Sequence, residues 1–446
     1  TDIGAPNRLL WFTPSHALAE ETAEAWRELG LTAAVLRGHE RLHPVLKAPM
    51  CRDPEAIQAA LNAGADPQKT VCKAKGGARC AHFHGCLKQR NRDEVQAADV
   101  VVAPYDVLYT GFAVDPGTIA AIIVDEGCWA RATRVTTSLT VEALTSQFLP
   151  RLGVGMQKNR AASRRANHQA LRSKLQRALY ANGPGPVTRQ NLADSGLTAQ
   201  DCEHAVSHER SMMVDPGLAP GLTGAERRTA FADAQRNERL RSLVRVWELA
   251  KDLLASDGEA SARLRVEPGG DLHRITTIGT VAIDNDLADK PVLHLDATLR
   301  PEIAAQLLAR LQTTTIEAAA PNMSTHLVTG SFGKSAIVPD DRAPPDKNAR
   351  RQRNLADCVE HVRWHARRLA PGRILVVTYK SVEAAFAAIP GVETGHFNAM
   401  AGLDGFKDVA AIFIIGRPLP RESDLHPPCA ALFDHIVEGR YGWQTV

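Results

Sequence analysis

Short apolar runs and an amphipathic segment alternate at the start of the chain. Residues 8–16 (RLLWFTPSH) are typical of a buried strand that ends in a turn, and residues 17–29 carry apolar side chains at helical spacing. Residues 31–36 form a second apolar run. A strand, a helix and a strand in this order predict a βαβ unit and, with it, a parallel sheet.

The sheet is predicted to resume beyond a polar interruption. Residues 99–103 (DVVVA) and 120–124 (AAIIV) are continuous apolar runs, which suit strands covered on both faces. Residues 40–95, before them, are rich in Cys, Gly, Pro and basic residues. We expect this stretch to be an inserted module that is held together by ligands to its cysteines rather than by an apolar core.

The middle and the end of the chain follow two further patterns. Helical spacing is expected from about residue 140 to 265, with a clear helix over 225–255. Residues 300–446 then show a second α/β pattern. We expect strands at 275–283, 292–295, 374–378 and 410–415, helices at 301–311 and 354–369, and a surface loop at 338–350.

Composition places the chain among ordinary globular proteins. Its 446 residues, 44% apolar and 23% charged, are enough for several domains. It has no apolar run of the roughly 20 residues that a membrane span needs, and its polar start is unlike a secretory signal. Because the eight cysteines are irregularly spaced, we expect reduced thiols in a cytoplasmic protein rather than a disulfide scaffold. We also expect a monomer without a membrane partner.

Two acidic residues follow an apolar strand in AIIVDEGCW. Asp125 and Glu126 would lie at the carboxyl end of that strand, where open α/β sheets bind ligands. In an ATPase the first carboxylate holds magnesium through water and the second orients the attacking water. Asp296 and Thr298 follow another apolar strand and could sense the phosphate state. A polar turn or cap at the end of a core strand is the alternative for both.

Four cysteines fall within residues 51–86. Cys51, Cys72, Cys80 and Cys86 have the spacing C-x20-C-x7-C-x5-C, without the tight C-x2-C pairs that are usual in zinc sites. Four cysteines at long irregular spacings are compatible with an iron–sulfur cluster. His82 and His84 could supply nitrogen ligands, which keeps zinc open, and buried unliganded thiols are the third alternative.

Basic residues gather in residues 151–190, which contain nine Lys and Arg and no Asp or Glu. Such a segment suits phosphate contacts, which give affinity for nucleic acid that is independent of sequence and sensitive to salt. A solvated helix face is the alternative. The candidate contacts are Arg160, Arg164, Arg165, Arg172 and Lys174.

The order of these features resembles the iron–sulfur superfamily 2 DNA helicases of the XPD/DinG type. LLWFTPSH is similar to motif Ia of that family, IIVDEGCW to its DEAH box, LHLDATL to motif III and ILVVTYKS to motif IV. Gly127 and Cys128 replace the Ala-His of the box. HFNAMAGLDGFKDVAAIFIIGRPLP is similar to motif V, and this ending looks closest to helicase-like proteins of phages and mobile elements.

The resemblance implies an α/β fold with two RecA-like parallel-sheet motor domains and two insertions. The first motor domain would comprise residues 1–39, 96–139 and 270–299, the Cys-rich cluster module residues 40–95, the helical, basic, arch-like insertion residues 140–269, and the second motor domain residues 300–446.

The resemblance also implies roles for single residues. Cys51, Cys72, Cys80 and Cys86 would hold a [4Fe–4S] cluster. Asp125, Glu126 and Asp296 would contact ATP and Mg²⁺, and Thr298 would couple the two lobes. Thr13, Ser15 and His16, in the segment like motif Ia, are candidate nucleic-acid contacts. The implied activity is ATP-driven translocation on single-stranded DNA, from 5′ to 3′.

The chain departs from the family in two places. It has no G-x-x-x-x-G-K-[ST] phosphate loop, since Val328 stands where Gly333-Lys334-Ser335 would need the first glycine, and it has no clear motif VI. We therefore expect the middle of a longer protein, because Thr1 is not Met, or a motor that has lost turnover. A catalytically inactive nucleic-acid-binding protein with structural zinc and a metal-dependent nuclease are the alternative functions.

Overall fold

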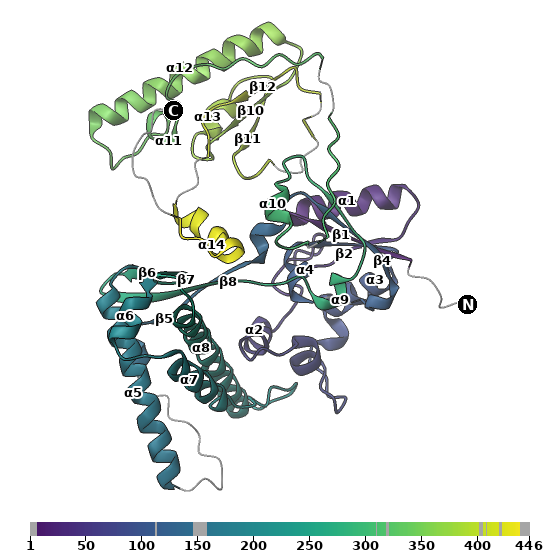
Figure 1. Cartoon of the computed structure of the whole chain (residues 1–446). Coiled ribbons are helices and arrows are strands. Elements are labelled where there is room, and N and C mark those ends of the chain that lie inside the picture. Colours follow the sequence, from purple (N-terminus) through teal and green to yellow (C-terminus); the bar gives the residue numbers. More distant parts are fainter. Residues whose placement is uncertain are drawn as a thin grey trace. The chain divides into compact units, whose positions relative to one another are not determined.

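The structure is a computed structural model that describes residues 7–111, 114–145, 158–308, 310–317, 321–400, 405–406, 408–418 and 422–437, with only the backbone described at 158–164 and 422. The chain divides into two units, residues 1–311 with 422–446 and residues 312–421 (Figure 1). Each unit has apolar clusters of its own. No helix among the described residues is long and apolar enough to cross a membrane.

The first unit contains a parallel sheet of five strands in the order β2-β3-β1-β4-β9. All four neighbouring pairs are parallel, which confirms the predicted α/β class. The strands are β1 (Arg8–Thr13), β2 (Ala33–Val35), β3 (Val100–Pro104), β4 (Ile119–Asp125) and β9 (Val292–Leu295).

Apolar side chains cover both faces of the central strand β1. Leu10 and Phe12 are fully buried in a cluster on one face. Leu9 and Trp11 pack on the opposite face against helix α1 (His16–Glu28), as the alternation of side chains along a strand requires. Helix α1 begins where the Ser15 hydroxyl accepts a hydrogen bond from the Leu18 N–H, at 3.2 Å.

Strand β9 forms one edge of this sheet. Its apolar residues Val292, Leu293 and Leu295 are exposed. Edge strands usually carry charges, prolines or bulges that block pairing, whereas an exposed apolar edge can accept a further strand. The outer side of β9 is therefore open to strand pairing within the described part of the chain.

A second, antiparallel sheet has the order β5-β8-β7-β6. The segment predicted to be helical therefore contains strands, and the strand predicted at 275–283 belongs to this sheet rather than to the parallel one. The strands are β5 (Thr133–Thr140), β6 (Gly185–Thr188), β7 (Ala260–Gly269) and β8 (Leu272–Thr280).

Four helices pack with the antiparallel sheet around a shared apolar cluster that includes the fully buried Trp247. Capping boxes start two of them, with Thr198 and Asp201 at α7 and Thr223 and Glu226 at α8. The helix predicted over 225–255 is confirmed. The helices are α5 (Lys158–Asn182), α6 (Arg189–Asp194), α7 (Ala199–Ser211) and α8 (Gly224–Ala255).

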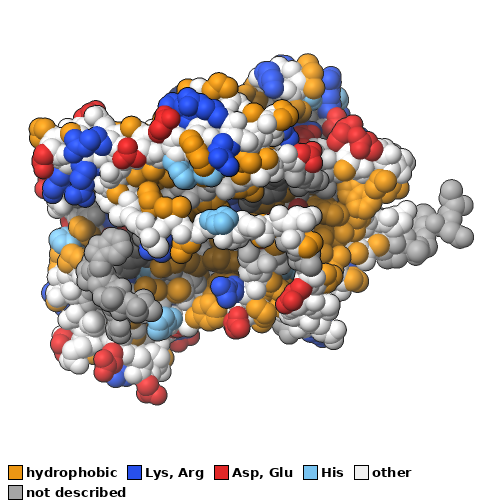
Figure 2. All heavy atoms as spheres, turned by 90° about the horizontal axis from the view of Figure 1, so that it is seen from above, with side chains coloured by type: hydrophobic (Ala, Val, Ile, Leu, Met, Phe, Trp, Pro, Cys, Tyr) orange, Lys and Arg blue, Asp and Glu red, His pale blue; other side chains and the backbone are white. Residues whose placement is uncertain are grey.

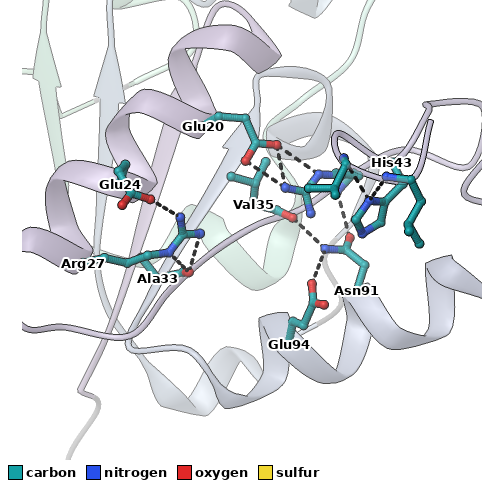
Figure 3. A network of polar contacts seen from close by, with 11 residues as sticks. Glu20, Glu24, Arg27, Ala33, Val35, His43, Asn91 and Glu94 are labelled. Atoms are coloured by element: carbon teal, nitrogen blue, oxygen red, sulfur yellow. Dashed lines mark hydrogen bonds and ion pairs between the residues drawn. The ribbon is translucent and has the colours of Figure 1, made fainter. Parts of the chain in front are cut away.

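The Cys-rich module contains α2 (Pro54–Asn62), a π-helical turn (Gln68–Cys72) and α3 (Leu87–Ala97). A buried polar network joins this module to the parallel sheet (Figure 3). The Asn91 side chain accepts the Arg37 N–H at 3.0 Å and donates to the Val35 carbonyl at 2.8 Å. The Arg37 guanidinium in turn binds Glu20 of α1. These contacts fix the position of the module relative to β2 and α1.

The remaining helices of the first unit are short, except for α14. Helix α14 packs on the antiparallel sheet, where Ala430 and Ala431 contact Ala262 and Ile278. The predicted second domain of residues 300–446 is thus smaller in the structure, because both of its ends belong to the first unit. These helices are α4 (Asp106–Thr110), α9 (Asn285–Ala288), α10 (Pro301–Ala304) and α14 (Glu422–Phe433).

The second unit is a parallel sheet of three strands in the order β11-β10-β12, packed with helices. The strands predicted at 374–378 and 410–415 are confirmed. Helix α12 starts earlier than predicted, in what we expected to be a loop, since a proline is favourable in the first turn of a helix. The elements are β10 (Ile374–Thr378), β11 (Val392–His396), β12 (Ala411–Ile414), α11 (Lys334–Ile337), α12 (Pro345–Leu369) and α13 (Glu383–Ala387).

Candidate functional site

Three carboxylates meet at the carboxyl ends of two neighbouring parallel strands. Asp125 is the last residue of β4 and pairs in register with Leu295, the last residue of β9. The Glu126 N–H donates to the Leu295 carbonyl at 2.7 Å. Asp296 follows Leu295, so the structure brings Asp125, Glu126 and Asp296 to one edge of the sheet.

The three carboxylates influence one another electrostatically. Burial raises the pKa of Glu126, and the charges of Asp296 and Asp125 raise it further. The Asp296 side chain is 5% exposed. Its Oδ1 accepts the N–H and the hydroxyl of Thr298 at 2.7 and 3.0 Å. Thr298, an exposed residue, is thereby tied to the carboxylate cluster.

Two residues that the sequence did not assign to this site hold its backbone. Glu126 has a left-handed φ of 68°, which is costly for a residue other than glycine. Nε2 of His294 donates to the Glu126 carbonyl at 2.9 Å, and the Tyr105 hydroxyl donates to the Asp125 carbonyl. His294 is the one polar residue in the strand sequence VLHL, and that interruption was its only sequence signal.

Gly127 is confined by the same cluster. A Cβ at this position would lie 3.0 Å from Nε1 of Trp129 and 3.3 Å from Oδ2 of Asp296. The neighbouring side chains would have to shift for any larger residue. The glycine that replaces alanine in the motif therefore fits the crowding of the carboxylates in this chain.

We predict that Glu126→Gln stabilises the protein at neutral pH. Because the pKa of Glu126 is raised above its ordinary value of 4.5, its ionised form costs stability in the folded state. This cost is absent below the unfolded pKa and complete above the folded one. We expect Glu126→Gln to raise the melting temperature by about 2 °C at pH 7, and by less at pH 4.

Thermal denaturation of both proteins across this pH range would measure the effect. The exposed Glu28→Gln is the matched control and should melt like the wild type at every pH. An equal shift at pH 4 and pH 7 would contradict a role for the Glu126 charge.

The four cysteines of the module lie in two neighbouring pairs. The Cys80 N–H donates to the Cys72 carbonyl at 3.0 Å. The Cys86 thiol lies 3.6 Å from the carbonyl of Met50, which directly precedes Cys51. None of the four is in a disulfide.

The pairs are close enough to affect each other's ionisation. Burial raises the pKa of Cys72 to about 12, and the charges of Cys51, Cys86 and Cys80 add to the shift. Burial also raises the pKa of Cys51, with contributions from Cys86 and Cys80. The raised pKa values keep the thiols of Cys51 and Cys72 protonated at neutral pH, and a metal would have to displace these protons.

A buried lysine lies beside the thiols. Burial lowers the pKa of Lys88 to about 8, and the positive charge of Arg92 lowers it further, whereas the charges of Cys86 and Cys72 oppose the shift. The ammonium group of Lys88 donates to the Arg37 carbonyl. This lysine places a buried amino group next to the thiols. The sequence suggested it only as one of several basic residues in the module.

The donor set fits a metal centre by its chemistry. The four free cysteines belong to one module, which also contains the buried Lys88. No group of three Cys, His, Asp or Glu side chains within the described residues is already arranged to hold a metal ion. His82 and His84 are exposed, and His84 lies 3.3 Å from Arg79.

An ion pair joins the Cys-rich module to helix α8. The Arg227 guanidinium makes two hydrogen bonds of 2.6 Å to the Asp53 carboxylate, which also caps α2. This ion pair lowers the pKa of Asp53. A cavity of about 240 Å³ beside it is lined by residues that include Cys80, His82, Leu218, Leu222 and Phe231. The cysteines thus lie next to the helical insertion.

The candidate nucleic-acid contacts at the end of β1 have different surroundings. Thr13 is fully buried and its hydroxyl donates to the Ser15 carbonyl at 3.0 Å, which corrects the prediction that it reaches a ligand. Ser15 is exposed but caps α1. His16 is half-buried, and burial, together with the charge of Arg41, lowers its pKa.

The basic segment does not form one exposed stripe. Arg172 is buried and makes a two-pronged ion pair with the fully buried Glu209, at 2.9 and 2.7 Å, which corrects its assignment as a nucleic-acid contact. Lys174 donates to the Gly196 carbonyl at 2.7 Å, and Arg165 is partly buried. The side chains of Arg160 and Arg164 lie outside the described residues.

The fold is similar to two solved structures. The structure named "XPD_Helicase" matches 93% of this chain and 78% of its own, with 12% sequence identity and a TM-score of 0.37. The structure named "Truncated XPD" matches 68% of this chain and 85% of its own, with 12% identity and a TM-score of 0.30. No protein-family model and no curated protein matches the sequence. At these low values the likeness concerns the fold alone.

Proposed function

We propose that this chain is part of an ATP-dependent helicase that moves on single-stranded DNA. The observation that carries the proposal is the cluster of Asp125, Glu126 and Asp296 at the ends of two adjacent parallel strands. Open α/β sheets bind their ligands at this edge. A raised carboxylate pKa suits a group that orients and deprotonates an attacking water near neutral pH.

Each residue of the carboxylate cluster would have its own role in ATP hydrolysis. Asp125 would hold the magnesium ion of ATP through water, and that ion would neutralise phosphate charge. Glu126 would orient the attacking water, with His294 and Tyr105 keeping its backbone in position. Asp296 and Thr298 would connect the nucleotide to the rest of the chain. Two hydrogen bonds from Thr298 to the Asp296 carboxylate hold these residues together.

The cysteine module would hold a [4Fe–4S] cluster through Cys51, Cys72, Cys80 and Cys86. A cluster would fix loops that otherwise have a small apolar core. Because Arg227 joins Asp53 to α8, that order would extend to the helical insertion, where single-stranded DNA would be contacted. The proposed DNA residues are Ser15, His16 and the exposed basic residues of the module.

A second candidate function is nucleic-acid binding without hydrolysis, with structural zinc in the cysteine module. One observation favours it: the chain has no G-x-x-x-x-G-K-[ST] segment, since Val328 stands where Gly333-Lys334-Ser335 would need the first glycine. Iron and sulfide analysis of the purified protein separates the two functions, since iron with sulfide supports the helicase and zinc alone supports the second candidate.

We predict that the chain binds a fluorescently labelled oligo(dT) in equilibrium anisotropy titrations. The affinity should fall about tenfold or more between 50 and 200 mM salt, because phosphate contacts release counterions. ATP hydrolysis by this chain alone should stay near background, because no G-x-x-x-x-G-K-[ST] segment is present. Absence of DNA binding at low salt would refute the proposed function, and strong hydrolysis would mean that the phosphate site is elsewhere.

A further inference from the structure

Helix α12 of the second unit carries an exposed, basic face. The helix contains seven Lys and Arg residues and three acidic ones. Two of the basic residues are neutralised by ion pairs, Arg351 with Asp340 and Arg363 with Glu360. The other five are exposed and have no ion pair within the described residues: Lys347, Arg350, Arg353, Arg367 and Arg368.

An exposed tryptophan lies on this face. Trp364 is 50% exposed, although a soluble helix usually buries so large a ring. The Arg368 guanidinium carbon lies 4.7 Å from the centre of the Trp364 ring, which is cation–π geometry. Positions 350, 353, 364 and 368 share one side of a helix, since they follow spacings of three and four residues. The stacked pair therefore extends the basic face.

The opposite side of α12 is held firmly by the core. Val362 is fully buried and Ala366 is nearly so. Between the two sides, the rings of His361 and His365 lie against Phe413 of β12, with their centres 5.8 and 5.2 Å from the centre of the Phe413 ring. The helix is thus fixed in rotation, and Trp364 is held on the outer side rather than free to turn into the core.

We propose that this face of α12 binds single-stranded nucleic acid, with one base stacked on the Trp364–Arg368 pair. Proteins that bind single strands without sequence preference combine a positive track for the backbone with aromatic rings for the bases. From Arg350 to Arg368 the helix extends roughly 27 Å, enough for several nucleotides. The face carries two exposed acids between the basic groups, Asp357 and Glu360, and Glu360 is paired with Arg363.

Charge complementarity and the stack favour nucleic acid over other ligands. The unpaired arginines favour an anionic ligand, and a flat ring stacked with a guanidinium is suited to the face of a base. Figure 2 views the molecule from the side on which α12 is drawn in Figure 1, and it shows groups of Lys and Arg side chains among apolar ones. This proposal deepens the proposed function by adding a DNA contact in the second unit.

The test uses anisotropy titrations of the full chain with labelled oligo(dT) at several salt concentrations. Trp364→Ala should weaken binding about tenfold with the same salt dependence, because stacking is not ionic. Trp364→Phe should restore most of the affinity. Arg353→Ala, which removes a charge outside the stack, should instead lower the slope of log affinity against log salt by about 0.7, the value for one phosphate contact with a single strand.

Arg363→Ala is the matched control on the same helix, since its charge is already neutralised by Glu360. It should leave the affinity within about twofold of wild type. If the wild type binds DNA and Trp364→Ala binds it with the same affinity, this inference is wrong, and the proposed function is unaffected. Failure of the wild type to bind would refute the proposed function. Binding of poly-glutamate that is lost in Trp364→Ala, without DNA binding, would show a protein surface and overturn the inference as well.

Discussion

Replacing Cys72 by serine is expected to abolish iron binding, with loss of about four iron atoms per chain and of the broad visible absorbance of an iron–sulfur cluster. Cys72 is buried, and the charges of the three other cysteines help to raise its pKa. A serine hydroxyl is a poor ligand for a cluster, and the three remaining cysteines would leave one iron without its thiolate. Iron, sulfide and zinc analysis together with visible spectra would measure the change.

The loss should also affect the contact with the helical insertion. If the cluster orders the loops around Asp53, Cys72→Ser should weaken the ion pair between Asp53 and Arg227. Limited proteolysis should then cut within residues 40–95 at least several times faster than in the wild type. Hydrogen exchange of α2 would report the same loosening without a protease.

Cys358→Ser is the matched control. Cys358 is partly buried in the second unit and lies near none of the four module cysteines in the sequence. Its iron content and spectrum should equal those of the wild type. Zinc in the wild-type protein without iron or sulfide would contradict the cluster and would support the second candidate function. Metal-free wild-type protein that keeps the protease resistance of the module would contradict both.

The carboxylate site could be predicted from the sequence because the geometry of a parallel sheet is regular. Carboxyl ends of parallel strands meet at one edge, so two apolar strands that each end in acidic residues are expected to place those residues together. The residues that hold Glu126 were harder to find. His294 and Tyr105 act on backbone carbonyls rather than on side chains, and such contacts leave little pattern in a sequence.

The middle of the chain was predicted less well. Strand β5 pairs with β8, more than a hundred residues later in the chain, and β6 is a short Gly-Pro segment. Neither strand has a strong local signal, since non-local pairing stabilises them. The central parallel strands β1, β3 and β4 were found because each is a short continuous apolar run, whereas β11, with the sequence VETGH, lacks such a run and was not predicted.

Arg172 shows why a charge run misled the prediction. It lies on the same helix side as the buried Leu175 and Leu179, at spacings of three and seven residues, so helical periodicity already placed it inward. The partner that allows this burial, Glu209, lies in α7 and lacks a local link to α5 in the sequence. Counting charges along the segment could not separate a buried pair from an exposed stripe.

Replacing Arg172 by methionine is expected to destabilise the helical insertion by about 3–5 kcal/mol at pH 7, because it leaves the charge of Glu209 buried without its main partner. Glu209 is fully buried, and Nε2 of His168 lies 2.9 Å from its Oε1. Burial alone would raise the pKa of Glu209, but hydrogen bonds from His168 and Arg172 lower it below the ordinary value. Denaturant unfolding followed by circular dichroism would measure the loss.

The pH dependence separates this charge effect from a packing defect. In the wild type, the lowered pKa means that Glu209 stabilises the fold above the unfolded value of 4.5 and that this contribution is lost as pH falls. In Arg172→Met the pKa of Glu209 should rise, so protonation relieves the buried charge. The destabilisation should therefore shrink between pH 7 and pH 4.

Two further variants complete the experiment. Arg172→Met combined with Glu209→Gln should recover a large part of the lost stability, since no buried charge remains. Lys174→Met, on the same helix, removes a partly exposed partner of Asp201 at 3.8 Å and should cost no more than about 1 kcal/mol. A pH-independent loss in Arg172→Met would indicate a packing defect and would contradict the buried-charge argument. Wild-type stability with weakened DNA binding would mean that Arg172 faces solvent and that the original assignment to nucleic acid was right.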